Sequence, residues 1–258
     1  MSTIEILSLG GAGVAAGVIN AIAGGGTLVT FPMLLLFGTP PVVANATSTV
    51  ALVIGTAGSM FGYRRHLESV KPRLSTFLPV SILGGFIGSV LLTQTSDKTF
   101  SRMIPFLILF ATVLFLAQGF VRRQVRFEAN PEASGRRVRM FGTILFQLGV
   151  AIYGGYFGAG IGILMLASLG IIGLHDIHEM NTLKTVLGSA INLVAAGWFI
   201  VAGLIHWPKA CVMTVGALAG YYLGSHYAQR IPQKYVRTII TAIGFVLSGV
   251  AFYKEFLS

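Results

Sequence analysis

Lys184 is the side chain in this sequence that could most directly carry chemistry. It lies three residues after Asn181, at the start of the apolar run in "HEMNTLKTVLGSAINLVAAGWFIV". An ionisable group just inside an apolar helix is costly in a membrane and usually has a function. The alternative is a lysine near a helix end that extends its ammonium group to the membrane surface. The glycine-rich breaks described next favour a lysine that neutralises an anion.

Three consecutive glycines, Gly24–Gly26, interrupt a run from Ile6 to Tyr63 that has no charged residue. Each glycine inside a helix costs roughly 1 kcal/mol relative to alanine. Residues 4–37 are too many for one membrane span and too few for two. We therefore predict a helical hairpin with its tip at these glycines, and a second hairpin with its tip at Gly158–Gly162 in "YFGAGIG".

Two hairpin tips that meet near the centre of a bilayer would bring two helix N-termini together. Their free N–H groups, at Gly24–Thr27 and Gly160–Ile163, would favour an anion. The alternative is close helix packing without a ligand, because small residues are common where membrane helices cross. The occurrence of such tips at matching places in two parts of the chain favours a site.

Asn45 and Asn181 are shared by both parts of the chain, each at the start of an apolar run. Both would suit a helix N-cap, and the nearby hydroxyls could bond to a ligand or to their own helix. The predicted substrate-binding residues are Gly24, Gly25, Gly26, Thr27, Asn45, Thr47, Ser48, Gly160, Gly162, Asn181, Lys184 and Thr185.

Other chemistry has weaker support. His175, Asp176, His178 and Glu179 do not have the spacing of a standard zinc motif such as H-E-x-x-H. The two carboxylates suit the start of a helix, and a proton relay through His178 or Glu179 stays open. Cys211 is the single cysteine and has no evident base partner. We expect no catalytic residue, no metal site and no cofactor, and therefore no enzyme.

The eight acidic residues lie near the ends of apolar runs or in loops. Carboxylates in mid-span, which would bind cations or form a long proton wire, are missing from the sequence. This distribution argues against a cation transporter and favours a neutral or anionic substrate.

Composition identifies the class of protein, because 54% of the 258 residues are hydrophobic and only 10% are charged. Soluble domains have about 25% charged residues. The long uncharged runs fit spanning helices and not the short alternating strands of a barrel. The net charge of +10 fits basic loops on the cytoplasmic side of a membrane better than nucleic-acid binding. We expect an all-α, multi-pass integral membrane protein.

The sequence repeats at an offset of 136 residues, with Asn45 matching Asn181 and Pro72 matching Pro208. We predict a first transmembrane repeat at 1–123, a basic cytoplasmic linker at 124–139 and a second repeat at 140–258. Each repeat would be a broken glycine-tipped hairpin followed by three transmembrane helices. Inverted repeats leave four of the 18 basic residues outside, and parallel repeats leave six. The positive-inside rule therefore favours inversion, a recurring transporter design.

Two segments resemble a known family. "GVINAIAGGGTLVTFPMLLLFGTPPVVANATSTVALVIGTAGSMFGYRR" and "YGGYFGAGIGILMLASLGIIGLHDIHEMNTLKTVLGSAINLVAAGWFIVAGLIHWPKA" are similar to the two repeats of the sulfite exporter TauE/SafE family of bacterial permeases. The resemblance implies a bacterial inner-membrane exporter of sulfur-containing anions such as sulfite, sulfonates or related organic acids, driven by the proton gradient or the membrane potential. Its partners would be the anion and the lipid bilayer.

Several alternatives remain open at this stage. A passive anion channel would use the same site chemistry as a transporter. An intramembrane enzyme or an assembly subunit explains the repeated glycine breaks and Lys184 less well. A coupling proton and a homodimer are also left open by the sequence.

Overall fold

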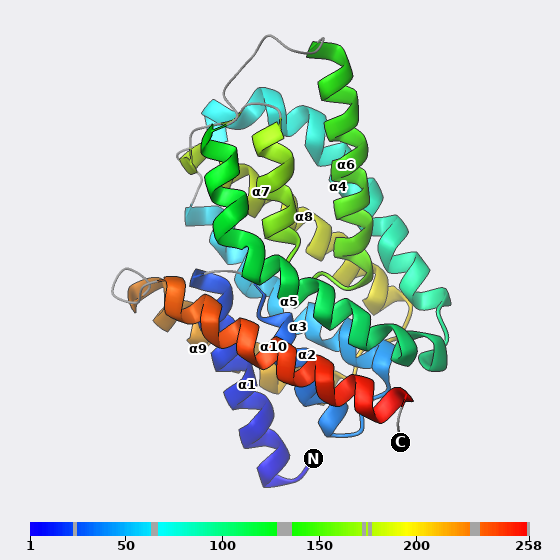
Figure 1. The fold of residues 1–258 in the computed structure, drawn as a ribbon. Coiled ribbons are helices and arrows are strands. Elements are labelled where there is room, and N and C mark those ends of the chain that lie inside the picture. Colours follow the sequence, from blue (N-terminus) through cyan, green and yellow to red (C-terminus); the bar gives the residue numbers. More distant parts are fainter. Residues whose placement is uncertain are drawn as a thin grey trace.

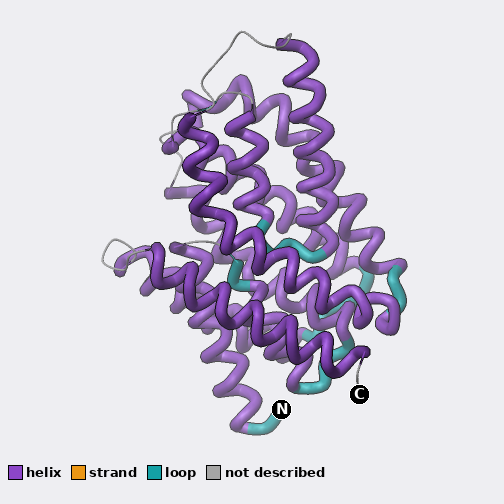
Figure 2. Tube along the Cα trace, in the orientation of Figure 1, coloured by secondary structure: helices purple, strands orange, loops and turns teal. Residues whose placement is uncertain are grey.

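The computed structural model describes residues 1–22, 25–62, 67–127, 136–171, 174, 177–227 and 233–256. These residues form helices joined by short loops, without a β-strand among them (Figure 2). The all-α prediction is therefore confirmed. The helices, labelled in Figure 1, are α1 (Thr3–Ile22), α2 (Thr27–Leu36), α3 (Pro41–Gly62), α4 (Leu67–Gln94), α5 (Asp97–Phe127), α6 (Arg136–Tyr156), α7 (Ile161–Ile171), α8 (Ile177–Val201), α9 (Trp207–Tyr227) and α10 (Gln233–Phe256).

Five helices in the described part of the chain are long and apolar enough to cross a membrane. They are Thr3–Ala21, Val70–Gln94, Asp97–Ala117, Glu179–Val201 and Thr238–Phe256, and shorter apolar helices lie at Thr27–Leu36, Pro41–Thr56 and Met140–Tyr156. Large apolar side chains on their outer faces are exposed, as lipid contact requires. The prediction of a multi-pass membrane protein is thus supported by length, composition and surface.

The first hairpin is held closed by a buried lysine at its open end. Lys209 Nζ lies 2.9 Å from Glu5 Oε1 at the start of α1, and it donates to the Phe37 carbonyl oxygen and Thr39 Oγ1 just after α2. Helix α2 therefore returns to the end of the molecule from which α1 starts, as predicted for a hairpin. At its tip, Gly25 has a φ of 97°, a conformation that favours glycine.

The second hairpin has the same form. Gly158 and Gly160 at its tip have φ values of 82° and 79°. Its arms, α6 and α7, are joined by a hydrogen bond of 3.2 Å from Ser168 Oγ to Gln147 Oε1. Each half of the chain is thus a glycine-tipped hairpin followed by three longer helices (Figure 1).

The offset of 136 residues reappears in the helices themselves. Helices α3 and α8 begin at Pro41 and Ile177, and α5 and α10 begin at Asp97 and Gln233. Matched glycines also serve the same purpose, since Gly88 packs α4 against the Ile152 carbonyl of α6, and Gly224 packs α9 against Val18 of α1. These glycines allow the helices to cross closely.

Corresponding helices of the two halves run antiparallel where they meet. Ser189 Oγ of α8 donates to the Thr56 carbonyl oxygen near the end of α3, and the amide of His206, in the loop after α8, donates to Thr47 Oγ1 near the start of α3. The two helices therefore run in opposite directions. Between α5 and α10, Arg102 lies near Glu255, whereas Gly244 packs on Thr112. Inverted halves would produce this arrangement. The inverted sense of the repeat stays a prediction, which these pairs support.

We call the end that holds Glu5, Lys209 and Phe256 the terminal end, and the end where α6 begins at Arg136 the linker end (Figure 1). Helix α5 continues to Phe127 and α6 begins at Arg136, so both ends of the segment predicted as a linker at 124–139 are helical.

Candidate functional site

The first hairpin tip is capped from within the protein. The Gly26 amide donates to Asn20 Oδ1 at 2.7 Å, and Asn20 Nδ2 donates to Tyr221 Oη of α9 at 2.9 Å. The Leu28 amide bonds to the Gly25 carbonyl oxygen. In the described part of this tip, the amides of Gly25 and Thr27 are the N–H groups that remain for a ligand. Gly24 lies outside the described residues.

The second tip is shaped by Tyr153. Its hydroxyl donates to the Ala159 carbonyl oxygen at 2.7 Å, and its own carbonyl oxygen accepts from the amides of Phe157 and Gly158. The Ile163 amide already bonds to the Gly160 carbonyl oxygen. The Ile163 amide is therefore not available to a ligand, although it belongs to the predicted donors Gly160–Ile163.

The aromatic ring of Phe115, in α5, lies close to both hairpin tips. This side chain is fully buried. A Cβ added at Gly25 would meet its Cζ atom, and a Cβ added at Gly160 would lie 3.7 Å from its Cε2 atom. Phe31 and Phe157 pack edge to face nearby, with ring centroids 5.5 Å apart. One buried apolar ring therefore lies close to both tips.

Lys184 lies on α8 against the first turn of α7. A Cβ added at Gly162 would be 3.2 Å from its Cδ atom and 3.9 Å from its Cε atom. The side chain is half-buried and comes from within α8, not from a loop. Glycine at position 162 thus leaves the room in which the lysine stem lies. The sequence linked Lys184 to the second tip, and the structure places the two side by side.

Asn45 joins α3 to the second hairpin. Helix α3 begins at Pro41, so Asn45 lies one turn inside it, and its Nδ2 atom donates to the Tyr156 carbonyl oxygen at the end of α6. The interpretation of Asn45 as an N-cap is wrong, and Asn181 likewise lies four residues after α8 begins. Asn45 is 1% exposed and its Oδ1 atom has no partner in the protein. Oδ1 is therefore a buried acceptor close to the tip.

The hydroxyls beside Asn45 are used inside the protein. Thr47 Oγ1 accepts from the His206 amide just before α9, and Ser48 Oγ lies 2.6 Å from Thr30 Oγ1 of α2. Both hydroxyls therefore bond to other parts of the chain, α2 and the loop before α9, and not to their own helix or to Lys184. Because α3 and α8 are antiparallel, Asn45 and Thr47 lie toward the terminal end. The other predicted ligands, Asn181 and Thr185, share α8 with Lys184 toward the linker end.

The acidic and histidine cluster at the start of α8 forms an ion pair with α4. Glu179 Oε2 lies 3.0 Å from Arg73 Nη1 at the start of α4. His175 and Asp176 lie outside the described residues. Among the described residues, no group of three His, Cys, Asp or Glu could hold a metal ion. A relay through His178 or Glu179 stays a prediction.

Sequence reasoning missed Asn20, Tyr153 and Phe115. Asn20 could have been found as a polar residue within the apolar arm, six residues before Gly26. No sequence signal separates Phe115 from the other aromatic residues of α5, because only the tertiary packing directs it between the tips.

Comparisons with known proteins agree with this architecture. The sequence profile described as "Sulfite exporter TauE/SafE" matches residues 9–251. A "Probable membrane transporter protein" of Haemophilus influenzae is 28% identical over 249 residues, which cover 94% of this chain and 92% of that protein. "Probable membrane transporter protein YfcA" of Escherichia coli K12 is 25% identical over 245 residues, with 93% and 87% covered.

A third relative, "Probable membrane transporter protein ORF9" of a Sinorhizobium species, is 24% identical over 234 residues, with 90% and 87% covered. No solved structure matches the chain. The family match runs from the first arm of the first hairpin to the last turns of α10. With two glycine-tipped hairpins at the centre of an apolar helical bundle, the chain belongs to the sulfite exporter TauE/SafE family of membrane transporters.

Proposed function

We propose that the protein exports small sulfur-containing anions, such as sulfite, sulfonates or related organic acids, across the bacterial inner membrane. The observation that carries the proposal is the position of Lys184 against Gly162 in the first turn of α7. A cation beside a helix N-terminus attracts an anion from two sides, by its charge and by the helix dipole. The family and its relatives support a transporter.

The anion would bind on the Lys184 side of the second tip. There the amides of Ile161 and Gly162 and the lysine ammonium would act together. The Phe115 ring lies close to both Gly25 and Gly160, so a substrate in this conformation would lie beside the ring. Asn45 Oδ1, a buried acceptor near the same tip, would bind a hydroxyl or amino group on an organic substrate.

Alternating access would require the two ends of the molecule to open in turn. In this conformation the Lys209 contacts with Glu5, Phe37 and Thr39 close the first hairpin at the terminal end. Helices α1 and α9, and helices α4 and α6, are packed through glycines, so each pair would move as a unit. Opening would separate these units around the tips. A coupling proton and a homodimer are further parts of the proposal that need their own tests.

The proposal is tested with purified protein in proteoliposomes. Uptake or release of sulfite and of simple sulfonates is compared for the wild type, Lys184→Ala, Lys184→Arg and the control Lys98→Ala, whose lysine is exposed at the start of α5. We expect Lys184→Ala to abolish anion transport while Lys98→Ala leaves it unchanged. Normal transport by a folded Lys184→Ala variant would disprove the role of Lys184.

Binding is measured separately by thermal unfolding in detergent with a panel of anions. A ligand that binds only the folded state stabilises it by about 2.7 kcal/mol at a hundred times its Kd. We expect a sulfur oxyanion or sulfonate to stabilise the wild type more than chloride or acetate does. A passive channel differs from a transporter because its net flux depends only on the electrochemical gradient of the anion itself and not on a coupling ion.

A further inference from the structure

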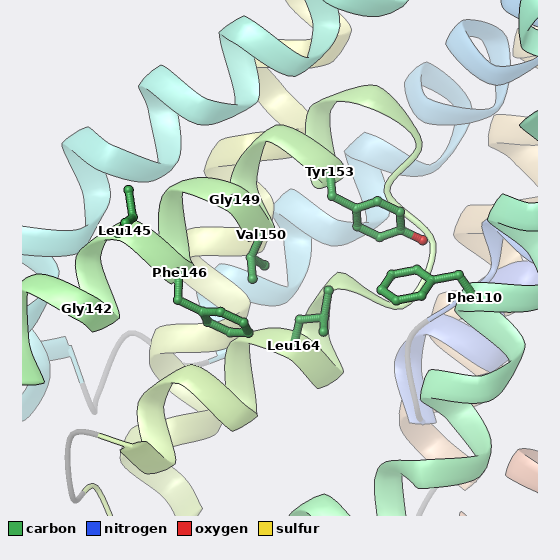
Figure 3. Close-up of a pocket in the computed structure, with 8 residues that line it drawn as sticks. All are labelled: Phe110, Gly142, Leu145, Phe146, Gly149, Val150, Tyr153 and Leu164. Atoms are coloured by element: carbon green, nitrogen blue, oxygen red, sulfur yellow. The ribbon is translucent and has the colours of Figure 1, made fainter.

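An open apolar groove runs along the outer face of α6, between α5 and α7 (Figure 3). Its volume is about 570 Å³, and it is lined by Phe110 of α5, Leu164 of α7, and Gly142, Phe146, Gly149 and Tyr153 of α6. The one polar group among these side chains, the Tyr153 hydroxyl, already donates to the Ala159 carbonyl oxygen. The groove therefore offers a ligand apolar contacts and no free hydrogen-bond donor from these side chains.

Two glycines create the groove. A Cβ added at Gly142 or Gly149 would meet nothing within 4 Å, whereas Gly155 on the same helix packs directly on the backbone of Gly85. Gly142 and Gly149 are seven residues apart and so lie on one face of α6, two turns from each other. Close helix packing does not account for these two glycines in the described chain, because no neighbouring atom lies near them.

The position and length of the groove indicate an acyl chain. Leu145, which lines the groove, and Phe141 are 59% and 70% exposed, so this face of the apolar helix Met140–Tyr156 lies toward lipid. From Gly142 to Tyr153 the helix rises about 17 Å. One leaflet of a bilayer has a hydrocarbon thickness of about 15 Å, half of the roughly 30 Å of the whole core. The groove is therefore about as long as a single lipid tail.

The sequence at the start of α6 indicates the headgroup. Helix α6 starts with Arg136, Arg137 and Arg139 at the linker end, and Arg139 is three residues before Gly142 on the helix. The sequence of α6 contains no acidic residue. Basic residues next to a membrane segment attract anionic lipids.

We propose that this groove binds an anionic phospholipid, with one acyl chain along Gly142–Tyr153 and the headgroup at the arginines that begin α6. The end of the tail would press on Tyr153, which stacks edge to face with Phe110 at 5.3 Å and holds the second hairpin tip through Ala159. Bound lipid would therefore stabilise the tip. The inference does not depend on the identity of the transported anion.

The test fills the groove with the protein's own side chain. Gly149→Leu and Gly142→Leu place a side chain where the tail would lie, without meeting a neighbour. Gly249→Leu on α10 and Gly197→Leu on α8 are matched controls, because a Cβ there also meets nothing within 4 Å. Delipidated protein is titrated with phosphatidylglycerol or phosphatidylcholine, and bound lipids are counted by native mass spectrometry and followed by thermal unfolding.

We expect the wild type to bind phosphatidylglycerol more tightly than phosphatidylcholine. Gly149→Leu should weaken binding of both lipids at least about fivefold, since it displaces several buried methylenes of the tail, and the two control variants should not. Replacing Arg136, Arg137 and Arg139 with glutamine should remove the preference for phosphatidylglycerol and leave phosphatidylcholine binding intact. This variant leaves the groove itself unchanged and keeps the proposal testable if a leucine variant fails to fold.

Three outcomes would overturn the inference. The first is equal binding of the two lipids by the wild type, and the second is undiminished binding by folded Gly149→Leu. The third is a disulfide-linked dimer of Gly149→Cys in membranes, together with a monomer for Gly149→Leu, because the groove would then hold a second copy of the chain.

Discussion

Lys209 gives the sharpest prediction about stability, because its partners and burial are both defined. Its ammonium group contacts Glu5 Oε1 at 2.9 Å, the Phe37 carbonyl oxygen at 2.9 Å and Thr39 Oγ1 at 3.0 Å. The side chains of Lys209 and Glu5 are only 8% and 13% exposed. We consider Lys209→Met, which removes the charge and keeps most of the apolar stem.

The magnitude follows from the lost bonds. A hydrogen bond from a charged group contributes about 1.5–3 kcal/mol, so the bonds to Phe37 and Thr39 alone give at least about 3 kcal/mol. Loss of the ion pair adds to this, because Glu5 would stay mostly buried without its partner. At about 2–4 °C per kcal/mol for a chain of this size, the expected fall in Tm is about 6–12 °C or more.

The repeat supplies a matched control. Arg73 stands 136 residues before Lys209, also directly after a proline, and its Nη1 atom lies 3.0 Å from Glu179 Oε2. This pair is 42% and 26% exposed, and exposed pairs are worth about 0–1 kcal/mol. Arg73→Met should therefore lower Tm by no more than about 4 °C.

Both variants are measured by thermal unfolding in one detergent, together with the double variant Glu5→Gln/Lys209→Met. We expect the double variant to recover part of the stability lost by Lys209→Met, since it removes the buried carboxylate. Equal losses for Lys209→Met and Arg73→Met would refute the argument, because burial would then not decide the strength of the two pairs.

Three further predictions concern the tips and the helix crossings. Phe115→Ala should lower the free energy of unfolding by about 3–5 kcal/mol and raise anion leak in proteoliposomes. Leu116→Ala, at the neighbouring lipid-facing position, should do neither. A Phe115→Ala variant without increased leak would show that the ring does not block anion flow past the tips. Asn20→Ala leaves the Gly26 amide uncapped and should cost about 1–2 kcal/mol in thermal unfolding; an unchanged Tm would contradict the cap. Gly220→Val meets the Val14 carbonyl oxygen of α1 and should destabilise by about 1–3 kcal/mol, against no loss for the open position Gly249→Val.

The sequence predicts the helical class and the two hairpins because both depend on local composition. Apolar runs require helices in lipid, and a glycine break in a run of the wrong length requires a turn. The beginning of α3 was predicted less well. Asn45 looked like a cap, but Pro41 already provides the fixed φ of a first helical residue, which leaves Asn45 to bond with Tyr156 from the other half.

The contacts that shape the site could not be predicted from the sequence, because they join residues far apart in the chain. Asn20 with Tyr221, and Phe115 with both tips, depend on how α1, α5 and α9 pack. Lys209 was expected among the four basic residues on the outer side of the membrane, yet it forms a buried bridge between α1, α9 and the end of α2. The alignment of Lys209 with Arg73 in the repeat was the one sequence signal that it pairs with a carboxylate.

The glycine crossings also determine when the protein can assemble during its synthesis. Gly13 and Gly17 of α1 press on the backbone of Met213 and Ala217 in α9, some two hundred residues further along the chain. The first hairpin therefore enters the membrane long before the helix that receives it has been translated. The glycine face of α1 therefore stays unpaired, in lipid or bound to an insertion factor, until almost the whole protein has been synthesised. A fragment that stops at Phe127 would leave both α1 and α4 without the helices they pack against, so separately expressed halves should accumulate only when they are made together.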